Sequence, residues 1–85
     1  MKFTIAGIGE ILWDIYGMEK YIGGVPANTA IHAHYLGHKG IIISRVGSDT
    51  LGKKLINSLK VKGLTTRYIQ QNSIFPTGTV QIKLR

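Results

Sequence analysis

The stretch that decides the fold is Gly23-Gly24-Val25-Pro26-Ala27-Asn28-Thr29-Ala30. Two adjacent glycines free the backbone for a tight turn, and Pro26 suits the first turn of a helix, where a missing N–H costs nothing. The run continues to Leu36 and stops at Gly37, so it predicts a helix that begins at Pro26. Free backbone N–H groups at its start, together with the amide of Asn28, predict a wall that binds a polar ligand.

Apolar, β-branched runs on both sides of this helix predict strands buried on both faces, at Phe3–Ile8 and Ile41–Val46. A second helix is expected over Thr50–Lys60, with Ser48 or Asp49 as its N-cap. Strands that alternate with helices imply right-handed crossovers, so we expect an α/β fold with a parallel sheet.

The remaining segments are more polar. Glu10–Tyr16 is expected to extend the first strand or to form a second one, and residues 17–22 are expected to be a short turn. Thr66–Gln70 is a candidate third strand. Apolar and polar residues then alternate up to Arg85, with Val80, Ile82 and Leu84 on one face. This pattern predicts a half-exposed strand whose edge needs cover from elsewhere.

Length and composition limit the class of protein. The 85 residues, 44% hydrophobic, suit one small domain or part of a larger one. The absence of cysteine excludes disulfides and thiolate metal sites. No signal peptide or membrane-spanning stretch is evident, so we expect a cytoplasmic protein without a membrane partner.

Charged and metal-binding side chains point to no further partner. The net charge is +7, but the positive charges are spread out, with Lys53, Lys54, Lys60 and Lys62 as the densest group. This distribution favours a solvated helix face over a surface for nucleic acid. The three histidines, His32, His34 and His38, do not share one helical face, so no metal site is expected.

Two features near the start of the chain invite functional interpretations. Gly7-Ile8-Gly9 lacks the third glycine of a dinucleotide fingerprint, because position 12 is leucine. Asp14 either ends its strand at a turn or accepts hydrogen bonds from two neighbouring hydroxyls, as a sugar offers. The residues alone leave both interpretations of Asp14 open.

Four segments together resemble the N-terminal part of the ribokinase-like (PfkB) carbohydrate kinases. They are Gly9-Glu10-Ile11-Leu12-Trp13-Asp14, Gly23-Gly24-Val25-Pro26-Ala27-Asn28, Arg45-Val46-Gly47-Ser48-Asp49-Thr50-Leu51-Gly52 and Pro76-Thr77-Gly78-Thr79-Val80. They occur in the family's order and cover nearly the whole chain. The opening segment and the Pro-Ala-Asn turn are most similar to those of fructokinases and related hexose kinases.

The resemblance implies an α/β sheet flanked by helices, with a small β lid formed by the Asp14–Ile22 region and residues 79–85. It implies that Asp14, Gly23, Gly24 and Asn28 hold sugar hydroxyls, and that the lid strands join a homo-oligomer. Residues 1–85 are then one N-terminal portion of a sugar kinase domain, truncated before the ATP-binding half.

The activity that the resemblance implies is transfer of the γ-phosphoryl group of Mg-ATP to a sugar hydroxyl, often with a monovalent cation. The family's catalytic aspartate lies in a Gly-Ala-Gly-Asp segment that this sequence lacks. Neither Asp14 nor Asp49 matches it, so we expect no catalytic residue, no bound cofactor and no activity in this chain alone. The alternative is a non-catalytic oligomeric binding or assembly module derived from the same scaffold.

Overall fold

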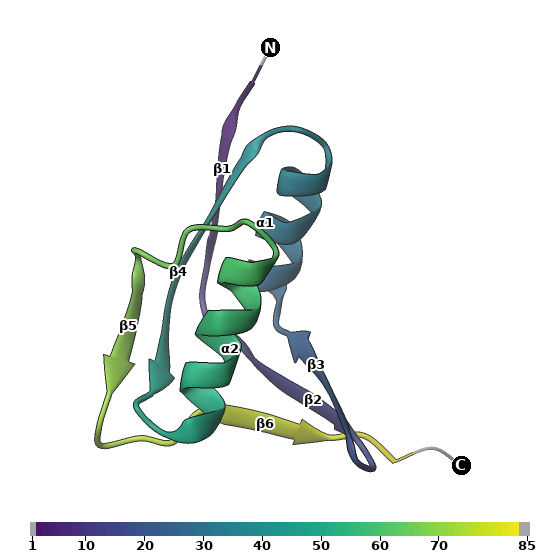
Figure 1. Ribbon diagram of the computed structural model, residues 1–85, viewed down its shortest axis with the longest axis vertical. Coiled ribbons are helices and arrows are strands. Elements are labelled where there is room, and N and C mark those ends of the chain that lie inside the picture. Colours follow the sequence, from purple (N-terminus) through teal and green to yellow (C-terminus); the bar gives the residue numbers. More distant parts are fainter. Residues whose placement is uncertain (1, 84–85) are drawn as a thin grey trace.

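The structure is a computed structural model that describes residues 2–83. Two helices and two small sheets make up this part of the chain (Figure 1). In chain order the elements are β1 (Thr4–Ile8), β2 (Leu12–Tyr16), β3 (Glu19–Gly23), α1 (Val25–Tyr35), β4 (Lys39–Gly47), α2 (Thr50–Val61), β5 (Ile69–Asn72) and β6 (Gly78–Gln81). None of the helices in residues 2–83 has the length and apolar character needed to cross a membrane.

The main sheet contains β1, β4 and β5 in that order, and all its strand pairs are parallel, as predicted. Helices α1 and α2 form the two crossovers and lie on the same face of the sheet (Figure 1). The prediction that the strands are buried on both faces is wrong, because Ile8 is 73% and Ile43 is 40% exposed. Side chains alternate along a strand, and nothing in residues 2–83 covers the face that carries these two.

Helix α1 follows its sequence signals closely. It begins at Val25, one residue earlier than predicted, and its C-cap Leu36 precedes Gly37, whose φ is 87°. Its buried residues are small: Pro26, Ala27, Ala30 and Ala33. Small side chains allow the helix axis to approach the sheet, so α1 packs directly against β1 and β4.

Helix α2 is amphipathic and has a complete N-cap. Asp49 is the cap residue, and its carboxylate accepts a hydrogen bond of 2.8 Å from the N–H of Gly52. Leu55 and Leu59 are fully buried against the main sheet. The lysines of α2 are exposed.

The second sheet, here called the lid sheet, has the order β3-β2-β6 and extends away from the main sheet (Figure 1). β2 and β3 form an antiparallel hairpin, while β6 pairs with β2 in parallel. The prediction of a turn over residues 17–22 is therefore wrong, because β3 already begins at Glu19.

The last two strands differ in their limits from the sequence prediction. β5 begins at Ile69 rather than at Thr66. β6 is the predicted final strand, and Val80 on it is 42% exposed. Leu84 and Arg85, which were expected to continue its alternation, lie outside the described residues.

Candidate functional site

Asp14 and Gly23 contact each other where the hairpin meets α1. Asp14 lies in the middle of β2, so the interpretation that it ends a strand at a turn is wrong. A Cβ atom added to Gly23 would lie 2.5 Å from Oδ2 of Asp14. The carboxylate therefore occupies the space that any side chain at position 23 would need.

Gly24 links this contact to the start of α1. Its φ of 98° is one that glycine adopts without strain, and a Cβ atom there would lie 2.4 Å from the carbonyl oxygen of Glu10. Gly24 is the N-cap residue, and no side chain caps the helix. Backbone N–H groups of the first turn are left for an outside acceptor.

Asn28 lies one turn into α1 and is exposed. Its backbone N–H donates to the carbonyl oxygen of Gly24, at 3.1 Å. Its side chain lines a hollow of about 440 Å³ along the outer side of α1, which it shares with Thr29 and His32. The structure thus brings Asp14 and Gly23 into contact, with Gly24 next to Gly23 in the chain. Asn28 lines a hollow that none of these three residues borders.

A hollow of about 450 Å³ beside Asp14 is lined by three residues that the sequence analysis missed: Tyr16, Glu19 and Tyr21. The hydroxyl of Tyr21 donates to Oε2 of Glu19 at 2.5 Å. This hydrogen bond, with the charge of Glu19, raises the pKa of Tyr21. Recognising the hairpin would have revealed these residues, since alternate positions of a strand share a face.

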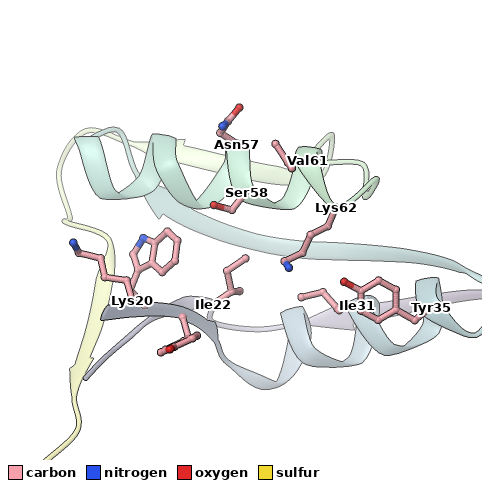
Figure 2. A pocket seen from close by; sticks show the side chains of 10 residues that line it. Lys20, Ile22, Ile31, Tyr35, Asn57, Ser58, Val61 and Lys62 are labelled. Atoms are coloured by element: carbon pink, nitrogen blue, oxygen red, sulfur yellow. The ribbon is translucent and has the colours of Figure 1, made fainter. Parts of the chain in front are cut away.

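A groove of about 540 Å³ lies between the two helices on the other side of the hairpin (Figure 2). Trp13, Ile22 and Ile31 supply apolar side chains to it. Figure 2 shows Lys20 at one end of the groove and Lys62 pointing into it from the end of α2. Asp14, Gly23, Gly24 and Asn28 do not line this groove.

Metal-binding side chains do not gather within residues 2–83. No three histidine, aspartate or glutamate residues lie together there in a way that could hold a metal ion. Asp49 is engaged by Thr77 and Gly52, and Asp14 lies against Gly23. The residues of this region do not by themselves fit a Mg²⁺ ion.

Residues 9–85 match the pfkB family of carbohydrate kinases. The chain belongs to the pfkB family. It is 37% identical over 92 residues to a putative sugar kinase of Pyrococcus horikoshii, covering 95% of this chain and 30% of the relative. It is 38% identical over 81 residues to an ATP-dependent 6-phosphofructokinase of Thermoanaerobacterium thermosaccharolyticum, covering 82% of this chain and 25% of the relative.

Solved structures of related kinases confirm the ribokinase-like fold. The P. horikoshii sugar kinase in complex with ATP superposes with a TM-score of 0.81 at 34% identity, over 98% of this chain and 31% of that one. The fructokinase of Halothermothrix orenii gives 0.79 at 32% identity, over 95% of this chain and 33% of that one. The chain therefore spans between a quarter and a third of the length of these relatives.

Proposed function

We propose that this chain provides the sugar-binding side of an ATP-dependent kinase that phosphorylates a hydroxyl of a hexose such as fructose. The observation that supports it most is the contact between the Asp14 carboxylate and Gly23 at the turn into α1. The similarity to a fructokinase, and the fructokinase-like opening segment of the sequence, support fructose as the first substrate to test.

The chemistry of the site suits the hydroxyl groups of a sugar. A carboxylate such as that of Asp14 accepts hydrogen bonds from two neighbouring hydroxyls at once, and charge-assisted bonds of this kind are short and strong. The uncapped N–H groups that follow Gly24 donate to sugar oxygens. The amide of Asn28, in the first turn of α1, both donates and accepts, so it suits a sugar hydroxyl.

The reaction needs further groups besides these. Phosphoryl transfer requires phosphates held in position, a metal ion that neutralises charge, and a group that receives the hydroxyl proton. ATP supplies the phosphoryl group in this proposal, with Mg²⁺ and a monovalent cation expected from the family resemblance. Residues 1–85 alone are proposed to bind sugar weakly or not at all, to act in the cytoplasm as part of the kinase, and to catalyse nothing.

A titration of the isotope-labelled chain with D-fructose, followed by NMR, tests the sugar site. We expect the backbone signals of Gly23, Gly24 and Asn28 to shift at millimolar sugar. Asn28→Ala should weaken the affinity roughly 5- to 150-fold, because about 1–3 kcal/mol is lost when hydroxyls are left unpaired. The matched control Asn57→Ala removes an exposed amide from α2 and should leave the affinity unchanged.

Two results would contradict this proposal. If Asn28→Ala bound fructose as tightly as the unaltered chain, Asn28 would not be part of the sugar site. Turnover of ATP and fructose by the purified chain would show that catalysis does not need groups beyond these residues.

We also propose that the chain associates with itself. β3 and β6 are the outer strands of the lid sheet, and exposed edges with apolar neighbours promote pairing between chains. Ile8 and Ile43 add an uncovered apolar face to the main sheet. Sedimentation at several concentrations tests this: we expect a dimer or larger species, and a monomer at all concentrations and salt levels would contradict it.

A further inference from the structure

Four side chains of the β2–β3 hairpin form a two-by-two patch on one face. In the antiparallel register, Asp14 lies opposite Tyr21, and Tyr16 lies opposite Glu19. The two members of each strand are two residues apart, so all four point to the same side. They line the hollow of about 450 Å³ described above.

Contacts within this patch hold its two rings in a defined arrangement. The rings of Tyr16 and Tyr21 meet edge to face, with centroids 5.6 Å apart and planes at 76°. The hydroxyl of Tyr21 is fixed by its hydrogen bond to Glu19. Tyr21 is still 52% exposed, so part of its ring is free to contact a ligand. An apolar ring surface thus lies beside two carboxylates.

The charges around the hollow are of one sign. Asp14 and Glu19 carry the two carboxylates, and no lysine, arginine or histidine lines it. Lys20, the residue between Glu19 and Tyr21, lies opposite Ile15 and, because side chains alternate along a strand, is on the other face of the hairpin from Asp14. It lines the groove between the helices, which Tyr21 also borders (Figure 2). A ligand with its own negative charge would be repelled here, whereas hydroxyl groups find acceptors.

From this arrangement we propose that Tyr16, Glu19 and Tyr21 extend the sugar site and select uncharged sugars over sugar phosphates and sugar acids. The carboxylates accept hydroxyl hydrogen bonds, and the tyrosine rings cover the C–H face of the sugar. This inference rests on the proposed function, because it takes Asp14 as a sugar ligand. It adds a specificity that the family alone does not supply.

NMR titrations with matched ligand pairs test the selectivity. The probes are D-fructose against D-fructose 6-phosphate, and D-ribose against D-ribose 5-phosphate. We expect the ring signals of Tyr16 and Tyr21 to shift with the neutral sugars. Each phosphorylated sugar should bind at least roughly fivefold more weakly, which is the effect expected for like charges a few ångströms apart in water.

Two variants assign this selectivity to the hairpin face. Glu19→Gln removes one charge but keeps an acceptor for the Tyr21 hydroxyl. It should therefore lower the ratio of affinities for the neutral and the phosphorylated sugar by roughly threefold. Lys20→Gln changes a neighbouring charge on the opposite face and should leave the preference as it is. Raising the salt concentration should narrow the preference in the unaltered chain, because exposed charges are screened.

The outcomes separate this inference from the proposed function. Shifts at Gly23 and Gly24 without shifts of the Tyr16 and Tyr21 rings would overturn the extended site and leave the proposed function standing. Equal binding of sugar and sugar phosphate would overturn the selectivity. If no signal of Gly23, Gly24, Tyr16 or Tyr21 shifted, the proposed sugar site would be contradicted, and this inference with it.

Discussion

Asp49 binds Thr77 through both of its carboxylate oxygens. Oδ1 accepts the Thr77 hydroxyl at 2.6 Å, and Oδ2 accepts its backbone N–H at 2.9 Å. The hydroxyl of Thr77 in turn accepts the N–H of Gly47 at 3.0 Å. Because Thr77 directly precedes β6, this cluster joins the lid sheet to the start of α2 and the end of β4.

Thr77→Val tests how much this junction stabilises the protein. Valine has the shape of threonine but leaves the N–H of Gly47 and Oδ1 of Asp49 without the Thr77 hydroxyl. We expect the free energy of unfolding to fall by about 1–3 kcal/mol, the cost of unsatisfied buried polar groups. Thr79→Val, at an exposed position of β6, should change it by less than about 0.5 kcal/mol. Urea denaturation followed by circular dichroism compares the two variants with the unaltered chain. Equal denaturation midpoints for Thr77→Val and Thr79→Val would contradict the prediction.

The pH dependence of stability offers a second test of the same cluster. The Thr77 hydroxyl, followed by the N–H groups of Thr77 and Gly52, holds the pKa of Asp49 below its usual value. The unfolded carboxyl takes up a proton near pH ~4, whereas the folded one does so only at lower pH. Unfolding therefore binds protons in this range, so the Asp49 contribution is full above pH ~4 and is lost as the pH falls further.

Asp49→Asn should remove this part of the acid dependence. Its denaturation midpoint should already be lower at neutral pH, and it should fall less steeply than that of the unaltered chain below pH ~4. Thr77→Val, which removes the largest cause of the pKa shift, should flatten the same region of the curve. If the denaturation midpoints of all three proteins fell equally steeply with decreasing pH, Asp49 would not cause this part of the acid dependence.

Local signals explain why both helices and the cap of α2 could be predicted. Gly24 and Gly37 mark the ends of α1, and Asp49 lies directly before an amphipathic run. These features depend on residues close in sequence, and their physical effect is largely independent of the rest of the fold. The resemblance added Asp14, Gly23, Gly24 and Asn28 as sugar ligands, and of these the structure shows Asp14 in contact with Gly23. Their role in binding sugar stays a prediction.

Properties that depend on distant segments were harder to predict. Glu19-Lys20-Tyr21 is polar, and the two-residue turn before it, Gly17-Met18, has a single glycine in place of the stronger Asn-Gly or Asp-Gly pair. From the residues alone β3 was therefore taken for a turn, although the resemblance implied lid strands over Asp14–Ile22. Ile8 and Ile43 were expected to be buried because apolar runs suggest covered strands, yet burial depends on which elements reach each face. The patch beside Asp14 was missed for the same reason as β3, since its face exists only once the hairpin pairs.

Trp13 connects the lid sheet to α2 and can be tested separately. It is 6% exposed, and its Nε1–H donates to the carbonyl oxygen of Leu51 at 2.9 Å. Trp13→Phe keeps an aromatic ring but removes the donor and part of the packing, so stability should fall by about 1–3 kcal/mol. Tyr68→Phe, at a 44% exposed position, is the control and should have little effect. Equal thermal midpoints for both variants would show that the Leu51 contact contributes nothing.

Gly23→Ala separates sugar binding from stability. The added methyl group would contact the flexible ends of Asp14 and Leu12 rather than backbone, so the chain should still fold while the Asp14 carboxylate is displaced. We expect fructose affinity to fall roughly 10-fold or more, since a charge-assisted hydrogen bond contributes about 1.5–3 kcal/mol. Gly17→Ala is the opposite case: its φ of 60° strains alanine, but no atom beyond its two chain neighbours lies within 4 Å of the new methyl group. Gly17→Ala should lower the thermal midpoint and leave fructose affinity unchanged. If Gly23→Ala also left fructose affinity unchanged, the position of Asp14 would not govern sugar binding.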